Sequence, residues 1–121
     1  MGVPNLAGHA CTWTETTTAN GNSNATHAAE AGKTHYIAGF SCSGSTSGAI
    51  DKFFVSIKDD STAKISVDCW AGGNASSGPT PLTVDMSNPL KITQGNACSI
   101  TWTDAGSIDV SGTIWGFTLD D

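Results

Sequence analysis

The sequence predicts an all-β protein, an antiparallel β-sandwich of seven to eight strands with a jelly-roll-like arrangement. From Gly32 onward, apolar side chains alternate with polar ones at a period of two, which places every second side chain on one face of a sheet. The apolar runs are short and are separated by clusters of Gly, Ser, Asn, Asp or Pro. No segment shows the period of a helix. We therefore expect two sheets packed face to face.

The N-terminal part of the chain differs in composition from the remainder. The segment 15–26, ETTTANGNSNAT, contains no large apolar residue and has Asn-Gly at its centre. Such a composition is typical of a loop. We therefore predict a flexible N-terminal arm with a polar loop over residues 1–26, followed by a β-sandwich domain over residues 27–121.

Seven alternating runs follow one another in the predicted sandwich. In chain order they cover residues 35–43, 53–58, 63–71, 82–86, 90–92, 98–103 and 108–119. The second and third runs are joined by DDST, which predicts a hairpin. The end of the last run carries apolar residues on both faces, so we expect both faces to be covered there.

The stretch HYIAGFSC contains two residue types that do chemistry, His35 and Cys42, and His27 lies eight residues before His35. On an extended strand His35 and Cys42 point to opposite faces, so they form no common site unless a bulge intervenes. We expect His35, at the start of its strand, to bond a loop carbonyl or solvent. Cys42 is expected in the core or in a disulfide.

The four cysteines, Cys11, Cys42, Cys69 and Cys98, are 27 to 31 residues apart. No pair has the CxxC spacing of a structural zinc site, so we predict no metal site and no cofactor. In an oxidising compartment the four can form two disulfides in any of three connectivities, and in a reducing one they are small buried hydrophobic residues. The sequence leaves both states open.

The candidate groups of catalytic residues lack the sequence patterns typical of active sites, and we predict that the protein is not an enzyme. The turn GSTSG at residues 44–48 lacks the pattern of a strained nucleophile elbow. The adjacent carboxylates Asp59 with Asp60, and Asp120 with Asp121, belong to side chains that diverge along a strand. We interpret them as turn and terminus residues.

Four tryptophans, Trp13, Trp70, Trp102 and Trp115, are the largest side chains of the chain. The alternation places Trp102 in the core. Outward aromatic side chains serve either as anchors of a subunit interface or as platforms for sugar rings. We favour the interface, and the candidate interface residues are Trp13, Trp70, Trp115 and Phe117.

The charge balance is acidic, with a formal net charge of −6 and only 13% charged residues. Binding to a phosphate backbone depends on cationic side chains, so a nucleic-acid partner is not expected. No run of eighteen apolar residues and no secretion-signal pattern is found, so neither a membrane span nor a leader is expected.

Three segments together resemble a family: ATHAAEAGKTHYIAGFSCSGS, then FFVSIKDDSTAKI, then NPLKITQGNACSITWTDAGSIDVSGTIWGF. They are similar to the small all-β virion proteins encoded among the structural genes of tailed bacteriophages. The resemblance covers about residues 25–117 and implies a capsid decoration or cement protein. Such a protein is made in the host cytoplasm and lies on the outer capsid surface, bound to the major capsid protein, often as a homotrimer.

The same resemblance leaves a second function open. Related sandwiches form part of a fibre or tail attachment, in which case Trp70 or Trp115 would stack on a carbohydrate or receptor. No catalytic residue is implied by the resemblance. The four cysteines depart from the pattern expected of most members, which leaves open whether disulfides stabilise the particle outside the cell.

Overall fold

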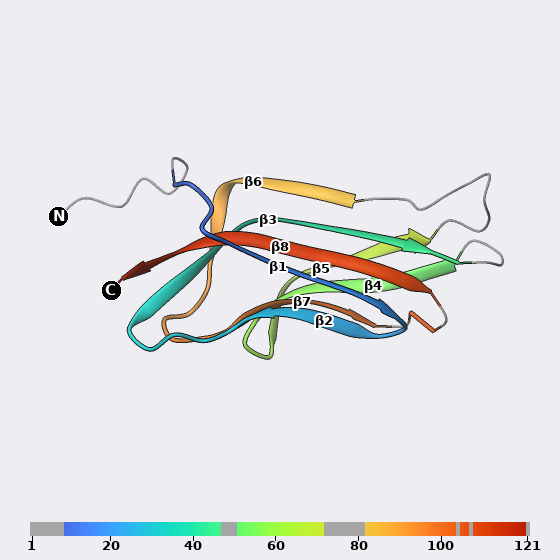
Figure 1. The fold of residues 1–121 in the computed structure, drawn as a ribbon, viewed down its shortest axis with the longest axis horizontal. Helices are drawn as coiled ribbons and strands as arrows, with labels where there is room; N and C mark the ends of the chain where they lie inside the picture. The colour runs from blue at the N-terminus through green and yellow to red at the C-terminus, as the bar shows by residue number, and fades with distance from the viewer. Residues whose placement is uncertain (1–8, 47–50, 72–81, 104, 107, 121) are drawn as a thin grey trace.

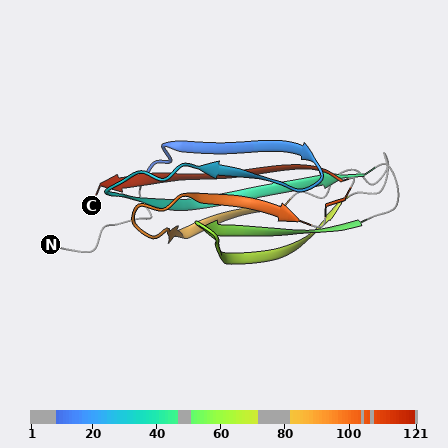
Figure 2. The same cartoon turned by 90° about the horizontal axis from the view of Figure 1, so that it is seen from below.

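The computed structural model describes residues 9–46, 51–71, 82–103, 105–106 and 108–120, and it confirms the all-β prediction. Eight strands form two sheets that lie face to face (Figure 1, Figure 2). The strands are β1 (Trp13–Asn20), β2 (Ser23–His27), β3 (Lys33–Ser45), β4 (Asp51–Asp59), β5 (Thr62–Ala71), β6 (Leu82–Lys91), β7 (Cys98–Thr103) and β8 (Asp109–Asp120).

The two sheets have the strand orders β1-β8-β3-β6 and β2-β7-β4-β5, and every pairing is antiparallel. First and last strands pair, second pairs with seventh, third with sixth, and fourth with fifth. This nested pairing is the strand order of a jelly roll, in which a long folded ribbon is wound across two sheets. The predicted β-sandwich, including its jelly-roll-like arrangement, is therefore observed.

The core lies between the sheets and is built from alternate residues of the central strands. Trp102, Phe40 and Phe53 are among the largest side chains with less than 2% exposure. The Trp102 ring lies over Gly112, where an added Cβ would come within 2.5 Å of the ring, and Nε1 donates to the carbonyl of Gly21 at 2.9 Å. The inward position predicted for Trp102 is thus confirmed, with its polar atom satisfied.

The predicted loop over residues 15–26 is wrong, because this segment forms most of β1 and β2. Thr is β-branched and suits a strand. The outer face of β1 is held to β8 by hydroxyl pairs, Thr16 with Thr113 and Thr18 with Ser111, each 3.1 Å apart. An edge strand needs little apolar area of its own, so a lack of large apolar residues does not exclude one.

A β-bulge in β3 corrects a second expectation. The register of β3 against both neighbours shifts between Ile37 and Gly39, so Ile37 and Phe40 both point into the core. As a result, His35 and Cys42 lie on the same inner face rather than on opposite faces. The hairpin of β4 and β5 is as predicted, with Asp60 at a positive φ of 53° in its turn.

Candidate functional site

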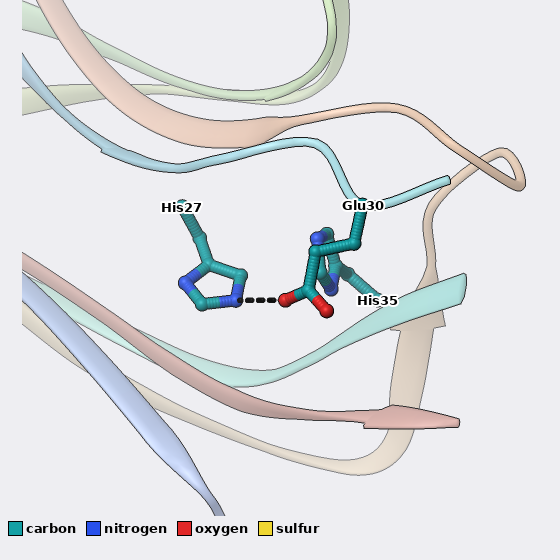
Figure 3. Close-up of side chains that lie close together, drawn as sticks. All are labelled: His27, Glu30 and His35. Atoms are coloured by element: carbon teal, nitrogen blue, oxygen red, sulfur yellow. Dashed lines mark ion pairs between the residues drawn. The ribbon is translucent and has the colours of Figure 1, made fainter. Parts of the chain in front are cut away.

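The structure brings together His27, Glu30 and His35 at one end of the sandwich (Figure 3). One ligand-capable atom from each of these side chains lies within 4.8 Å of the others. His27 ends β2, His35 is near the start of β3, and Glu30 comes from the connection between them. We call these three residues the histidine cluster.

The connection between β2 and β3 explains why these residues meet. β2 and β3 belong to different sheets, so residues 28–32 carry the chain across the end of the sandwich. The amide of Lys33 donates to the carbonyl of Glu30 at 3.2 Å, and Gly32 has a positive φ of 73°, which closes a tight turn. The turn places the Glu30 carboxylate beside the two imidazoles.

His27 is held on one side only. Its Nδ1 lies 2.7 Å from Oε2 of Glu15, and its ring stacks on Trp13 with the centroids 4.1 Å apart. The Nε2 atom is buried and has no hydrogen-bond partner. Oε1 of Glu30 lies 3.7 Å from it, beyond hydrogen-bond distance.

His35 is held on both sides and is only 1% exposed. Its Nε2 lies 2.8 Å from the carbonyl oxygen of Ala28; a carbonyl only accepts, so Nε2 carries a proton. Its Nδ1 lies 2.7 Å from the Thr118 hydroxyl, which also accepts from Nε1 of Trp13 at 3.1 Å. The predicted bond from His35 to a loop carbonyl is confirmed.

Carboxylates dominate the charge around the cluster. Glu15 and Glu30 flank His27, while Lys33 Nζ lies 3.7 Å from Glu30 and 3.4 Å from Asp120. The two imidazole rings meet edge to face, with centroids 4.4 Å apart. Two imidazoles and a carboxylate at this spacing are the donor set of a cation site. The sequence offered the spacing His27–His35 as a signal, but not the part of Glu30.

A second candidate site lies on the outer face of β4 and β5. Phe54 and Trp70 are the exposed large hydrophobic side chains of the described residues, at 38% and 53% exposure. Phe54 pairs with Asp68 and Lys52 pairs with Trp70, so the two aromatic residues are diagonal neighbours across the two strands. We call Phe54 and Trp70 the aromatic patch.

Polar groups border the aromatic patch. Lys52 Nζ lies 3.7 Å from Oδ2 of Asp68 and 6.0 Å from the centroid of the Trp70 ring. Among the predicted interface residues, Trp70 is therefore the one that exposes a large surface. Phe54 was missed, although its alternation with the buried Phe53 and Val55 indicates an outward position.

The other predicted interface residues are covered by the chain itself. Phe117 is 2% exposed and stacks on Tyr36 and on His9, with centroids 5.2 Å and 4.7 Å away. Trp115 is half-buried over Gly39, where an added Cβ would overlap its ring. Trp13 is half-buried against His27. These three aromatic residues offer less surface to a partner than Trp70.

Of the four cysteines, Cys42 and Cys69 are in contact, with their Sγ atoms 3.2 Å apart. All four are free thiols, and Cys11 is exposed. The hydrogen bond between the two thiols raises the pKa of Cys42 and lowers the pKa of Cys69. Burial, with the nearby charges of Asp59 and Glu15, raises the pKa of Cys98 to about 12, which leaves that thiol unreactive.

The carboxylate pairs considered in the sequence have separate roles. Asp59 is 4% exposed and accepts hydrogen bonds from the amide and hydroxyl of Thr93 and from the side-chain amide of Asn96, at 2.7–2.9 Å. Burial raises the pKa of Asp59, but these hydrogen bonds outweigh it and lower the pKa. Asp60 is exposed in the turn.

Two of the sequence candidates reach beyond the described part of the chain. Asp120 lies at the end of β8 and is exposed, and its partner Asp121 falls outside the described residues. Of GSTSG, residues 44 and 45 belong to β3, whereas residues 47–48 are outside the described residues.

No protein family model, no curated protein and no solved structure matches this chain. In the described residues, no helix is long and apolar enough to cross a membrane. The function is therefore inferred from the histidine cluster and the aromatic patch.

Proposed function

We propose that the protein is a non-enzymatic structural protein of a tailed-bacteriophage virion. It decorates or cements the outer surface of the capsid, as a homotrimer, by binding across subunits of the major capsid protein. The observation that carries the proposal is the aromatic patch, Phe54 and Trp70, on the outer face of β4 and β5.

The patch has the composition of an interface anchor. Aromatic side chains contribute most to binding when they become fully desolvated in the centre of an interface, with polar groups around them. Trp70 and Phe54 are exposed in the single chain, and the Lys52–Asp68 ion pair borders them. Burying them against a partner removes apolar surface from water without rearranging the core.

The fold supplies a suitable platform. Eight antiparallel strands with a continuous core between the sheets form a stiff body that presents its outer faces at fixed positions. Jelly rolls occur in viral capsid domains and in lectins. The fold alone assigns no function, so the proposal rests on the patch and on the resemblance to small virion proteins.

Light scattering with size-exclusion chromatography, followed by co-sedimentation with capsids stripped of the protein, tests this function. We expect a trimer that returns to the shells at a fixed ratio of copies to major capsid protein. A monomer that stays in the supernatant with shells of its own source would contradict the proposal.

The exposed indole of Trp70 favours one alternative, a carbohydrate- or receptor-binding domain of a fibre or tail. Sugar rings stack on exposed aromatic faces, and the neighbouring Lys52 and Asp68 can bond hydroxyl groups. Titration with host polysaccharide distinguishes the two functions. A change in tryptophan fluorescence that is lost in Trp70→Phe would favour the alternative, whereas no change would leave the capsid function.

A further inference from the structure

We propose that the histidine cluster is a binding site for a divalent transition-metal ion, with Zn²⁺ the ion that fits its donors best. The ligands are Nε2 of His27, the carboxylate of Glu30 and Nε2 of His35, with the Ala28 carbonyl oxygen as a fourth. This site goes beyond the proposed virion function and does not depend on it.

The hydrogen bonding of His27 favours a bound cation. Its Nδ1 faces Glu15 Oε2 at 2.7 Å, so Nδ1 donates the hydrogen bond, and in the neutral imidazole the lone pair is then on Nε2. That Nε2 is buried and has no hydrogen-bond partner. A buried nitrogen without a partner costs free energy, and the cost disappears when a cation accepts its lone pair.

The outer contacts of both histidines also favour a bound cation. Histidines that bind metals nearly always use the other ring nitrogen in a hydrogen bond that fixes the ring and the tautomer. Here Glu15 holds Nδ1 of His27, whose Nε2 has no hydrogen-bond partner, and Thr118 holds Nδ1 of His35, whose Nε2 reaches the ion once it no longer donates to the Ala28 carbonyl. Trp13 fixes this shell further, because it stacks on His27 and donates to Thr118.

His35 must change tautomer to bind. The ion displaces the proton from Nε2, Nδ1 takes up a proton, and the Thr118 hydroxyl oxygen then accepts a hydrogen bond from Nδ1–H. Thr118 already accepts from Trp13, and a hydroxyl has two lone pairs, so both donors fit. Nε2 of His35 and the Ala28 carbonyl oxygen, 2.8 Å apart, then both present lone pairs to the ion.

Donor type and spacing select the metal. Two imidazoles with a carboxylate and a further oxygen suit Zn²⁺ better than Ca²⁺ or Mg²⁺, which prefer oxygen alone. With bonds of about 2.0–2.1 Å, donors around a tetrahedral ion lie about 3.3 Å apart. One ligand-capable atom from each of His27, Glu30 and His35 lies within 4.8 Å of the others, and Glu30, whose side chain is 41% exposed, has room to move closer.

The site would join the two sheets at one end of the sandwich. His27 belongs to the β2 sheet and His35 to the β3 sheet, so one ion bonds both. An ion that binds the folded state alone raises the free energy of unfolding by mass action. Zn²⁺ is therefore expected to raise the melting temperature of the protein.

Isothermal titration with ZnCl₂ on chelator-treated protein tests the site, in a Cys11→Ser background that removes the exposed thiol. We expect one Zn²⁺ per chain and a raised melting temperature. Co²⁺ is expected to give the visible absorption of a tetrahedral site without thiolate bands. Glu30→Gln and His27→Gln are each expected to weaken binding at least tenfold, and Glu15→Gln about 10- to 100-fold.

His9→Gln is the matched control, because His9 stacks on Phe117 away from the cluster. It is expected to bind Zn²⁺ like the parent. Absence of binding at millimolar Zn²⁺, equal binding in Glu30→Gln and the parent, or a loss of binding in His9→Gln would each overturn the proposal. Circular dichroism on every variant separates lost binding from lost folding.

Discussion

The outer faces of the two sheets carry similar residue types but use them differently. On the β1-β8-β3-β6 sheet, Phe117 is enclosed by Tyr36 and His9, and small hydroxyl residues bond one another. On the β2-β7-β4-β5 sheet, Phe54 and Trp70 are left exposed. An outward aromatic residue therefore indicates an interface only when the chain does not already cover it.

The largest expected difference between the two faces is in the free energy of unfolding when their aromatic residues are replaced. Phe117→Ala is expected to lower the free energy of unfolding by about 3–5 kcal/mol, because it leaves a cavity between Tyr36 and His9. Trp70→Ala removes an exposed ring and is expected to change the free energy of unfolding by about 0.5 kcal/mol or less. Urea unfolding of both variants measures this, and equal losses would contradict the comparison.

Oxidation tests whether the two cysteines that meet between the sheets can form a disulfide. Cys42 lies on β3 and Cys69 on β5, in opposite sheets, with their sulfurs already in contact. With glutathione disulfide as oxidant, the two thiols lose two protons and two electrons, and two glutathione thiols form. We expect a Cys42–Cys69 bond that raises the free energy of unfolding by about 2–4 kcal/mol.

Peptide mapping of the oxidised protein identifies the bond. The buried Cys98 is expected to remain a thiol, and Cys11→Ser to leave the Cys42–Cys69 bond unchanged. A product in which Cys69 is joined to Cys11 instead would show that the folded state does not select the pair.

Two carboxylates, one buried and one exposed, are expected to differ less in their contribution to the free energy of unfolding, and that contribution depends on pH. Asp59 is buried under three hydrogen bonds, whereas Asp68 is exposed in the ion pair with Lys52. Asp59→Asn replaces one acceptor oxygen with an amide donor that faces other donors. We expect this to lower the free energy of unfolding by about 1–3 kcal/mol. Asp68→Asn is expected to cost at most about 1 kcal/mol.

The pH dependence follows from the sign of the shift at Asp59. Its pKa is lowered in the folded protein from an ordinary value of 3.8, so its stabilisation is present above that value and is lost as the pH falls through the folded pKa. Urea unfolding between pH 7 and pH 2 should show that the free energy of unfolding falls more steeply with decreasing pH in the parent than in Asp59→Asn. Parallel curves would show that Asp59 does not contribute to the loss of stability at low pH.

Much of the fold could be predicted from the sequence, because the alternation of residues such as Phe53 and Val55 reports which face of a strand is buried. The Thr-rich β1 was missed because its pairing with β8 is a tertiary effect that local composition does not contain. The bulge between Ile37 and Gly39 reverses the alternation of inward and outward side chains along β3, and no residue pattern in the sequence indicated it.

The sites were predicted less well than the fold. The position of Trp70 followed from alternation alone. The enclosure of Phe117 depends on His9, which is distant in sequence, and the meeting of His27 with Glu30 depends on how one turn crosses between sheets. Contacts of this kind are set by three-dimensional packing, so a single sequence offers the residue types but not their partners.

Co-sedimentation of patch variants with stripped capsids tests whether the aromatic patch is the capsid interface. The double variant Phe54→Ser/Trp70→Ser is compared with Trp115→Phe, a change on the opposite sheet that keeps an aromatic ring. We expect the double variant to stay folded and in the supernatant, while Trp115→Phe sediments with the shells like the parent. A folded double variant that still sediments at the parental ratio would contradict the aromatic patch as the capsid interface.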